Sequence, residues 1–438
     1  MLTLLGFGMV ITFMTLIMLK RLSPVVALIA IPIIFALFGG FGSDIGEMML
    51  KGIKKIAPTG VMLMFAILYF GVMIDAGLFD PLVNRVQRMV KGDPLKILVG
   101  TAVLAMTAGL DGEGTTTYMI SVSAMLSLCR RFQISTIKMA GVIILASGVM
   151  NISPWAGPMA RAATALNVDT AEVFMPMIPA MLAGMLGVVM VAWVLGMGER
   201  RRLGYRRDQP LIPSPDEDDA DPVLPKVEVA DDLRRPRLML VNLLLTIGLL
   251  TALVVNMLPL PVLFMIAFAL AITINYPNML LQRQRIAHYA GNALSVVVVV
   301  FAAGIFTGIL SGTGMVKAMA GSLLAIIPDS MGPHLAVITS IISIPLTFFV
   351  SNDAFYFGIL PVLSHTAAQY GITPLEMARA SLVGQPVHLL SPLVPSTYLL
   401  VGMAGIDFGD FQRFALKWAL LMCLALLSAS LLLGIVPL

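Results

Sequence analysis

The stretch LDGEGTTTYMISVS, from Leu110 to Ser123, decides how the rest of the chain is interpreted. It places Asp111 and Glu113 among glycines and hydroxyl side chains, at the end of an apolar segment. An ionised carboxylate is costly in hydrocarbon, and irregular backbone at membrane depth persists only where it is buried in protein or lines a watery cavity. We therefore interpret the stretch as a binding tip. The alternative is an ordinary loop outside the membrane.

Composition places the chain among membrane proteins. Of its 438 residues 58% are hydrophobic and 12% are charged, whereas about 25% of residues are charged in soluble domains. The net charge of +4 is modest, and most Lys and Arg lie at the ends of apolar segments, which indicates membrane topology rather than a nucleic-acid partner. Cys129 and Cys423 lie in opposite halves and indicate neither a disulfide framework nor a Cys-rich metal site. We expect an all-α polytopic membrane protein.

The first half contains apolar runs long enough to cross about 30 Å of hydrocarbon. They lie at Leu2–Leu19, Pro24–Phe41 and Ala57–Ala76. Two amphipathic, basic segments, Ser43–Ile56 and Phe79–Gly92, are expected to form helices at the membrane interface. Short apolar arms flank the DGEG tip, which predicts a re-entrant hairpin over 95–131 that enters and leaves on one side.

A second irregular site lies in the next apolar segment. NISPWAGP, residues 151–158, interrupts the helix predicted over 136–166. Because proline removes backbone hydrogen bonds inside a helix, we expect a broken helix whose free N–H and C=O groups become ligands. A simple proline kink is the alternative. A last span, Ala171–Gly198, completes the first half.

Residues 199–237 form the one strongly polar stretch, which contains Arg200–Arg202, several prolines and the acidic run Asp216–Asp219. This composition is typical of a linker rather than of a folded domain. If the linker is cytoplasmic, most other basic clusters also lie inside, as the positive-inside rule requires. Lys51, Lys54 and Lys55 are the exception.

The pattern repeats after the linker. An offset of 238 aligns Thr117 with Phe355, Ser153-Pro154 with Ser391-Pro392 and Asp169 with Asp407, and an offset of 237 aligns Pro24 with Pro261 and Gly77 with Gly314. We predict a first transmembrane repeat at 1–198 and a second at 238–438, with a hairpin at 333–370 and a broken helix at 373–402. Each repeat would cross the membrane five times, so the second would be inverted and both termini would be external.

Inverted repeats with broken helices place a substrate near the middle of the bilayer, where the halves meet. Both tips and both breaks should therefore form one site. The candidate substrate- or metal-binding residues are Asp111, Gly112, Glu113, Gly114, Thr115, Thr116, Asn151, Ser153, Pro154, Gly157, Arg161, Ser351, Asn352, Asp353, Ser391, Ser396 and Thr397.

Three carboxylates repel an organic anion unless cations accompany it. Oxygen ligands suit hard divalent ions or Na⁺, and closely spaced buried carboxyls are able to carry protons. Asp111, Glu113 and Asp353 are thus candidates for contact with a metal carried by the substrate, and together with His388 they are candidates for proton coupling. Arg161 either adds a charge-assisted bond to the anion or is a helix-end arginine at the interface.

Four motifs carry a resemblance to a known family. The opening MLTLLGFGMVITFMTLIMLKRLSPVVALIAIPIIFALFGGFG, the hairpin LDGEGTTTYMISVSAML, GVMNISPWAGPMARAATAL and FFVSNDAFYFGILPVL together resemble the bacterial citrate–metal–proton symporter family, part of the ion transporter superfamily. The resemblance implies proton-driven uptake of a complex of citrate with a divalent cation of the Mg or Ca class, across the inner (cell) membrane, with no other cofactor. It also implies a homodimer that works by an elevator motion.

The tips depart from the superfamily's dicarboxylate carriers, which have Ser-Asn-Thr at both tips. Here Asp353 follows Ser351-Asn352, and the first tip reads Asp-Gly-Glu-Gly-Thr from Asp111. Both departures favour a more negative site. The alternatives are a sodium- or proton-coupled carrier of another carboxylate and a sodium–proton antiporter. An enzyme is disfavoured, because the sequence has neither HExxH nor GxSxG.

Overall fold

The structure is a computed structural model that describes residues 1–90, 92–205, 231–255, 257–325, 327–328 and 330–438. The described residues form helices and loops, without strands. Seven of the described helices are long and apolar enough to cross a membrane. The predicted class, an all-α polytopic membrane protein, is confirmed.

The described part of the first half contains nine α-helices and a short 3₁₀ turn. They are α1 (Leu2–Met18), α2 (Pro24–Phe38), α3 (Ile45–Asp75), α4 (Asp80–Val90), α5 (Pro94–Ala108), η1 (Gly109–Asp111), α6 (Gly114–Arg131), α7 (Thr136–Met150), α8 (Gly157–Leu166), and α9 (Thr170–Arg202).

After the linker come the corresponding elements of the second half. They are η3 (Asp231–Leu233), η4 (Pro236–Leu238), α10 (Met239–Val254), α11 (Leu260–Asn275), α12 (Met279–Gly312), α13 (Met315–Leu324), η5 (Gly332–His334), α14 (Leu335–Phe349), the π-helix η6 (Ala354–Ile359), α15 (Leu360–Ala367), η7 (Ala368–Tyr370), α16 (Pro374–Ser381), α17 (Gln385–His388), α18 (Pro395–Ala404), and α19 (Phe408–Leu432).

The two halves share their order of elements and their points of left-handed backbone. Gly77 follows α3 with φ +82°, and Gly314 follows α12 with φ +74°. Asn167, after α8, and Gly405, after α18, also have positive φ, 56° and 66°. The spacings, 314 − 77 = 237 and 405 − 167 = 238, are those that the sequence alignment uses. A left-handed residue thus follows the same helix in each half, at the offsets that the sequence alignment uses.

The repeat-related helices α3 and α12 pack against each other in opposite directions. Residues early in α3 lie beside residues late in α12, since a Cβ on Gly52 would collide with the carbonyl oxygen of Gly304. At the other end Asp75 accepts a hydrogen bond of 2.9 Å from Tyr289 Oη. Glycine at position 52 thus allows close backbone approach, and α3 and α12 form an antiparallel pair.

One prediction is wrong: Ser43–Ile56 is not a separate helix at the interface. It is the first part of α3, which runs without interruption for 31 residues. Lys51, Lys54 and Lys55, the exceptions to the positive-inside rule, lie on this helix. Lys51 forms an ion pair of 2.6 Å with Glu47, one turn earlier. The helix continues because its core-facing glycine packs on α12, which outweighs the polar character of the segment.

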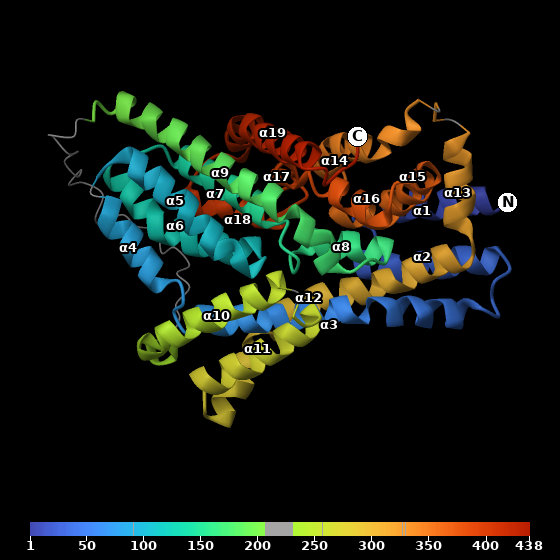
Figure 1. Ribbon diagram of the computed structural model, residues 1–438, viewed down its shortest axis with the longest axis horizontal. Helices are drawn as coiled ribbons and strands as arrows, with labels where there is room; N and C mark the ends of the chain where they lie inside the picture. Colours follow the sequence, from blue (N-terminus) through green and yellow to red (C-terminus); the bar gives the residue numbers. More distant parts are fainter. Residues whose placement is uncertain (91, 206–230, 256, 326, 329) are drawn as a thin grey trace.

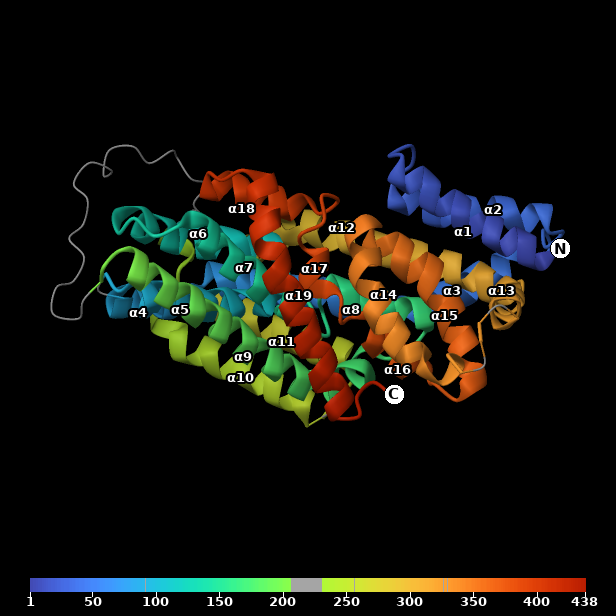
Figure 2. The same ribbon diagram turned by 90° about the horizontal axis from the view of Figure 1, so that it is seen from above.

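The helices form two layers. Figure 1 shows α3 and α12 running along the molecule, with α10 and α11 beside them, while the hairpins and broken helices lie on the other side. Both views place α10 and α11 toward one end of the long axis and α1, α2 and α13 toward the other (Figures 1 and 2). We call the end where α9 stops and α10 starts the linker end.

The predicted irregular segments lie as expected. A tip separates α5 from α6, and another separates α14 from η6; breaks separate α7 from α8 and α17 from α18. The predicted linker begins later than position 199, because α9 continues to Arg202. Asp216–Asp219 lie outside the described residues.

Candidate functional site

A cavity of about 520 Å³ lies where both tips and both breaks meet the α3–α12 pair. Leu63 and Ile67 of α3 and Val296 of α12 form one wall. Most predicted site residues form the other walls: Asp111, Gly112, Glu113, Gly114, Thr115, Asn151, Gly157, Arg161, Ser351, Asn352, Asp353, His388 and Ser396. Segments separated by more than two hundred residues therefore converge on one cavity, which we call the central cavity.

Five predicted site residues do not line the central cavity. Ser153 and Pro154 are buried within the first break. Thr116 donates a hydrogen bond of 2.7 Å to Glu113 Oε2, Ser391 donates one of 2.6 Å to the Phe348 carbonyl, and Thr397 donates one to the Leu389 carbonyl. These last three hydroxyls hold the tips and breaks in shape.

The first tip is a sharp turn fixed to the first break. Gly112 has φ +75°, and Asp111 Oδ1 accepts a hydrogen bond of 2.9 Å from the Glu113 amide. A Cβ on Gly112 would lie 2.8 Å from a ring carbon of Trp155. Trp155 Nε1 in turn donates to the Leu110 carbonyl at 2.8 Å. The tip therefore needs glycine both for its backbone and for the indole packed against it.

The second tip holds an ion pair between the two halves. Arg161 Nε on α8 donates to Asp353 Oδ1 at 2.6 Å, and the side chains are only 23% and 12% exposed. Beside them the buried Asn352 Oδ1 has no hydrogen-bond partner among the described residues. A buried polar atom without a partner is uncommon in native proteins, so this amide oxygen is available to a bound ligand.

His388 lies at the second break and has a defined tautomer. Its Nδ1 donates to the Thr347 carbonyl at 2.7 Å, because a carbonyl can only accept. The neutral ring therefore keeps its lone pair on Nε2. His388 also lines the central cavity, which keeps it among the candidates for proton transfer.

Gln385 connects the halves, and the sequence interpretation missed it. Asn151 Nδ2 donates to Gln385 Oε1 at 3.2 Å, and Gln385 Nε2 donates to Tyr356 Oη at 2.9 Å. Gln385 is fully buried. The signal was available, since a glutamine between Gly384 and Pro386 in an apolar helix requires a polar partner.

Three carboxylates from the two tips line the central cavity. No group of three or more His, Cys, Asp or Glu close enough to hold a metal ion occurs in the described ranges. Asp111 and Glu113 belong to the first tip, where the Glu113 amide donates to Asp111 Oδ1, and Asp353 belongs to the second.

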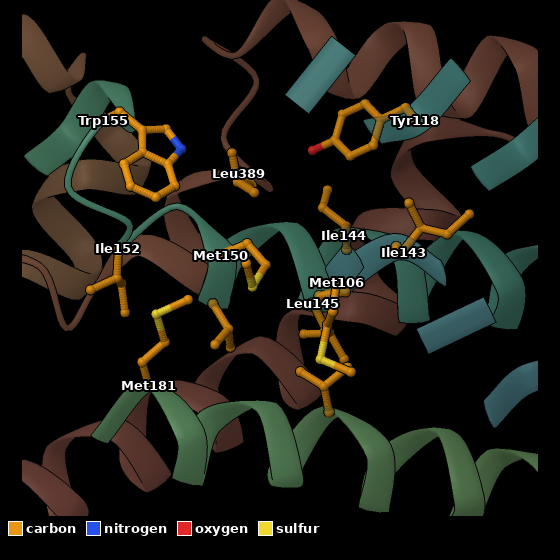
Figure 3. Packing of buried hydrophobic residues seen from close by; sticks show 14 of the residues in the cluster. Met106, Tyr118, Ile143, Ile144, Leu145, Met150, Ile152, Trp155, Met181 and Leu389 are labelled. Carbon is orange, nitrogen blue, oxygen red and sulfur yellow. The ribbon is translucent and has the colours of Figure 1, made fainter. Parts of the chain in front are cut away.

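Apolar packing supports the cavity from behind. Figure 3 shows Trp155, Met150 and Leu389, which line the cavity, above a layer that contains Leu145 and Met181. All of these side chains are buried. Close packing of this kind resists displacement of the polar groups in front of it.

Comparisons with known proteins identify relatives that are named as citrate transporters. The chain matches the family described as "Citrate transporter" over residues 6–384. It is 59% identical to a citrate transporter of Bacillus subtilis (strain 168), over 100% of both chains, and 52% identical to a Mg(2+)/citrate complex secondary transporter of the same organism, over 99% of both. The crystal structure of the YdaH transporter of Alcanivorax borkumensis is 18% identical with a TM-score of 0.55, covering 88% of this chain and 86% of that one. At this identity the likeness concerns the fold alone.

Proposed function

Because the chain belongs to the citrate transporter family, we propose that it imports citrate as a complex with a divalent cation, in symport with protons. Transporters of this family are not enzymes, and neither is this chain. The observation that carries the proposal is the convergence of three carboxylates and one guanidinium on the central cavity. A relative named as a Mg(2+)/citrate complex transporter supports the complex as substrate and Mg²⁺ as its metal.

Charge balance supports proton coupling. Citrate near neutral pH is close to a trianion, so its complex with a divalent cation carries about one negative charge. Three ionised carboxylates and Arg161 give the cavity a net charge of −2 when all are charged. Adding the complex increases this negative charge, which is expensive at low dielectric. Uptake of protons by cavity carboxylates would offset it.

The Arg161–Asp353 pair suggests how the proton is coupled. In the absence of substrate each charge neutralises the other at 2.6 Å. A free carboxylate of citrate would compete for Arg161 through a charge-assisted bond. Asp353 would then lose its partner, and we infer that it accepts the coupled proton at that point. Asp111 and Glu113, at the other tip, would face the metal.

The layered fold suggests how the site reaches both sides of the membrane. The central cavity lies between the α3–α12 pair and the hairpins, so sliding of one layer past the other would carry the tips across the bilayer. We propose this elevator motion, together with inverted orientation of the halves, a homodimer, a bacterial cell-membrane location, a cytoplasmic linker and external termini. The antiparallel packing of α3 on α12 supports the inversion.

Labelled citrate uptake into proteoliposomes tests the proposal. An inward proton gradient is imposed, and Mg²⁺, Ca²⁺ or a transition metal is supplied in turn. We expect accumulation only with a divalent cation present, and collapse of accumulation when a protonophore is added. Accumulation with a chelator present, or with sodium as the only gradient, would contradict the proposal. A pH-sensitive dye inside the vesicles, read with and without citrate, distinguishes sodium–proton antiport from citrate transport. Competition by other carboxylates shows whether the substrate is a different acid.

A further inference from the structure

A second hollow, of about 1030 Å³, lies at the linker end between α4, the start of α5 and the start of α10. Four cationic side chains line it: Arg85 and Arg88 of α4, Lys96 of α5 and Arg234 beside η4. We call it the basic pocket. It shares no lining residue with the central cavity.

The four cations come from segments that the fold holds in place. α4 is fixed to the first hairpin, because Val86 is buried and Gln87 Nε2 donates to the Ala124 carbonyl at 2.9 Å. The segment that carries Arg234 is fixed to the other layer. There the Arg235 amide donates to the Ala76 carbonyl at 3.1 Å, and Tyr276 Oη donates to the Leu233 carbonyl at 3.0 Å.

The charges around the basic pocket are unbalanced. Its lining contains one carboxylate, Asp80. Asp80 already forms an ion pair with Arg234, in which Oδ2 lies 3.2 Å from Arg234 Nη1. The positive-inside rule accounts for basic residues on this side of the membrane. It does not require four of them to converge on one hollow, where like charges repel. An anion would remove that repulsion.

The rest of the lining indicates which anion fits. Ala76, Pro81, Met89 and Met239 add apolar surface next to the charges. A site that is cationic on one side and apolar on the other matches a phospholipid, whose phosphate is joined to glycerol and acyl chains. Basic pockets of this kind at the cytoplasmic ends of membrane helices are known to bind lipid headgroups.

We propose that the basic pocket binds the phosphate of an anionic phospholipid, with Arg85, Arg88 and Arg234 contacting its oxygens. Arginine is suited to this role because its fork of donors matches phosphate oxygens. The bound headgroup would bridge α4, which belongs to the hairpin layer, and the α10 segment, which belongs to the α3–α12 layer.

The test measures lipid binding without citrate, so its outcome does not depend on the proposed transport activity. The protein is placed in phosphatidylcholine bilayers that contain spin-labelled phosphatidylglycerol, and the immobilised fraction is measured. The test variant is Arg85→Gln/Arg88→Gln. The matched control is Arg283→Gln, an exposed arginine of α12 outside the pocket.

We expect the double variant to bind the labelled lipid about 30-fold more weakly, as loss of two phosphate contacts implies, and the control to bind as wild type does. Arg85→Lys/Arg88→Lys should retain most of the binding because it retains the charge, which separates loss of charge from misfolding. Equal binding by the wild type and the Gln double variant would overturn the proposal. So would displacement of the labelled lipid by inorganic phosphate but not by unlabelled phosphatidylglycerol, which would assign the pocket to a soluble phosphate.

Discussion

Asp353→Asn tests whether the ion pair between the halves carries the coupled proton. The change keeps the size of the side chain and removes its charge. In the wild type Asp353 and Arg161 are largely buried and 2.6 Å apart. At an effective dielectric near 20, two charges about 4 Å apart interact by roughly 4 kcal/mol. The desolvation of both groups reduces the net value to about 2 kcal/mol, and the citrate carboxylate must displace this interaction to reach Arg161.

The variant should therefore bind the metal–citrate complex more tightly. Recovery of about 2 kcal/mol of binding free energy corresponds to a roughly 30-fold lower Kd. The loss of one negative charge from the cavity also favours binding of the negatively charged complex. Accumulation driven by a proton gradient should fall to background, because asparagine cannot carry the proton. Binding is measured by calorimetry on purified protein, and accumulation is measured in proteoliposomes.

Asp410→Asn serves as the matched control. Asp410 also lies near an arginine, Arg413 at 3.7 Å, but both side chains are exposed, so the change should alter neither binding nor accumulation. Unchanged gradient-driven accumulation in Asp353→Asn would remove Asp353 from proton coupling. Binding weakened tenfold or more would show instead that Asp353 touches the metal.

Three further predictions concern an ion pair at the linker end, the hydrogen bonds of Gln385 between the halves, and the divalent cation. Burial opposes ionisation of Asp93, but the hydrogen bonds and the charge of Arg200 outweigh it and lower the pKa of that carboxyl. A lowered pKa adds stability above the unfolded pKa of the carboxyl, and this added stability is lost as the pH falls through the folded pKa. The Tm of the wild type should therefore fall below about pH 4. Asp93→Asn should lose about 2 kcal/mol of stability at neutral pH and show a flatter profile of Tm against pH; identical profiles would contradict this. Gln385→Leu should cost about 2 kcal/mol in unfolding experiments, since Asn151 and Tyr356 lose buried partners, and an unchanged denaturant midpoint would refute it. Chelation of divalent cations should abolish citrate uptake, and Mg²⁺ should restore it; uptake that persists in the chelator would contradict transport of the complex.

The sequence was enough to locate the irregular parts of the chain. Glycines, prolines and carboxylates inside apolar segments are conspicuous because each is unfavourable there without a structural reason. They marked both tips and both breaks, and the offset between the halves predicted that these four segments would meet. The central cavity brings them together.

Pairings between distant residues could not be predicted in the same way. Arg161 and Asp353 are 192 residues apart, and nothing in the local pattern of either segment names the other as its partner. Ser43–Ile56 was misread for a related reason: its charges suggest an exposed surface helix, but the contact of Gly52 with α12 is long-range information. Local composition reports how polar a segment is, not what covers it.

The ion pair between the halves has no counterpart at the repeat-related positions. The position related to Arg161 is Leu399 (161 + 238 = 399), and the one related to Asp353 is Thr115 (353 − 238 = 115), neither of which can ionise. If the halves exchange their conformations during the transport cycle, the opposite-facing state gains no corresponding charge contact. The empty carrier would then have a preferred resting orientation, and its return step would be slower in one direction than in the other.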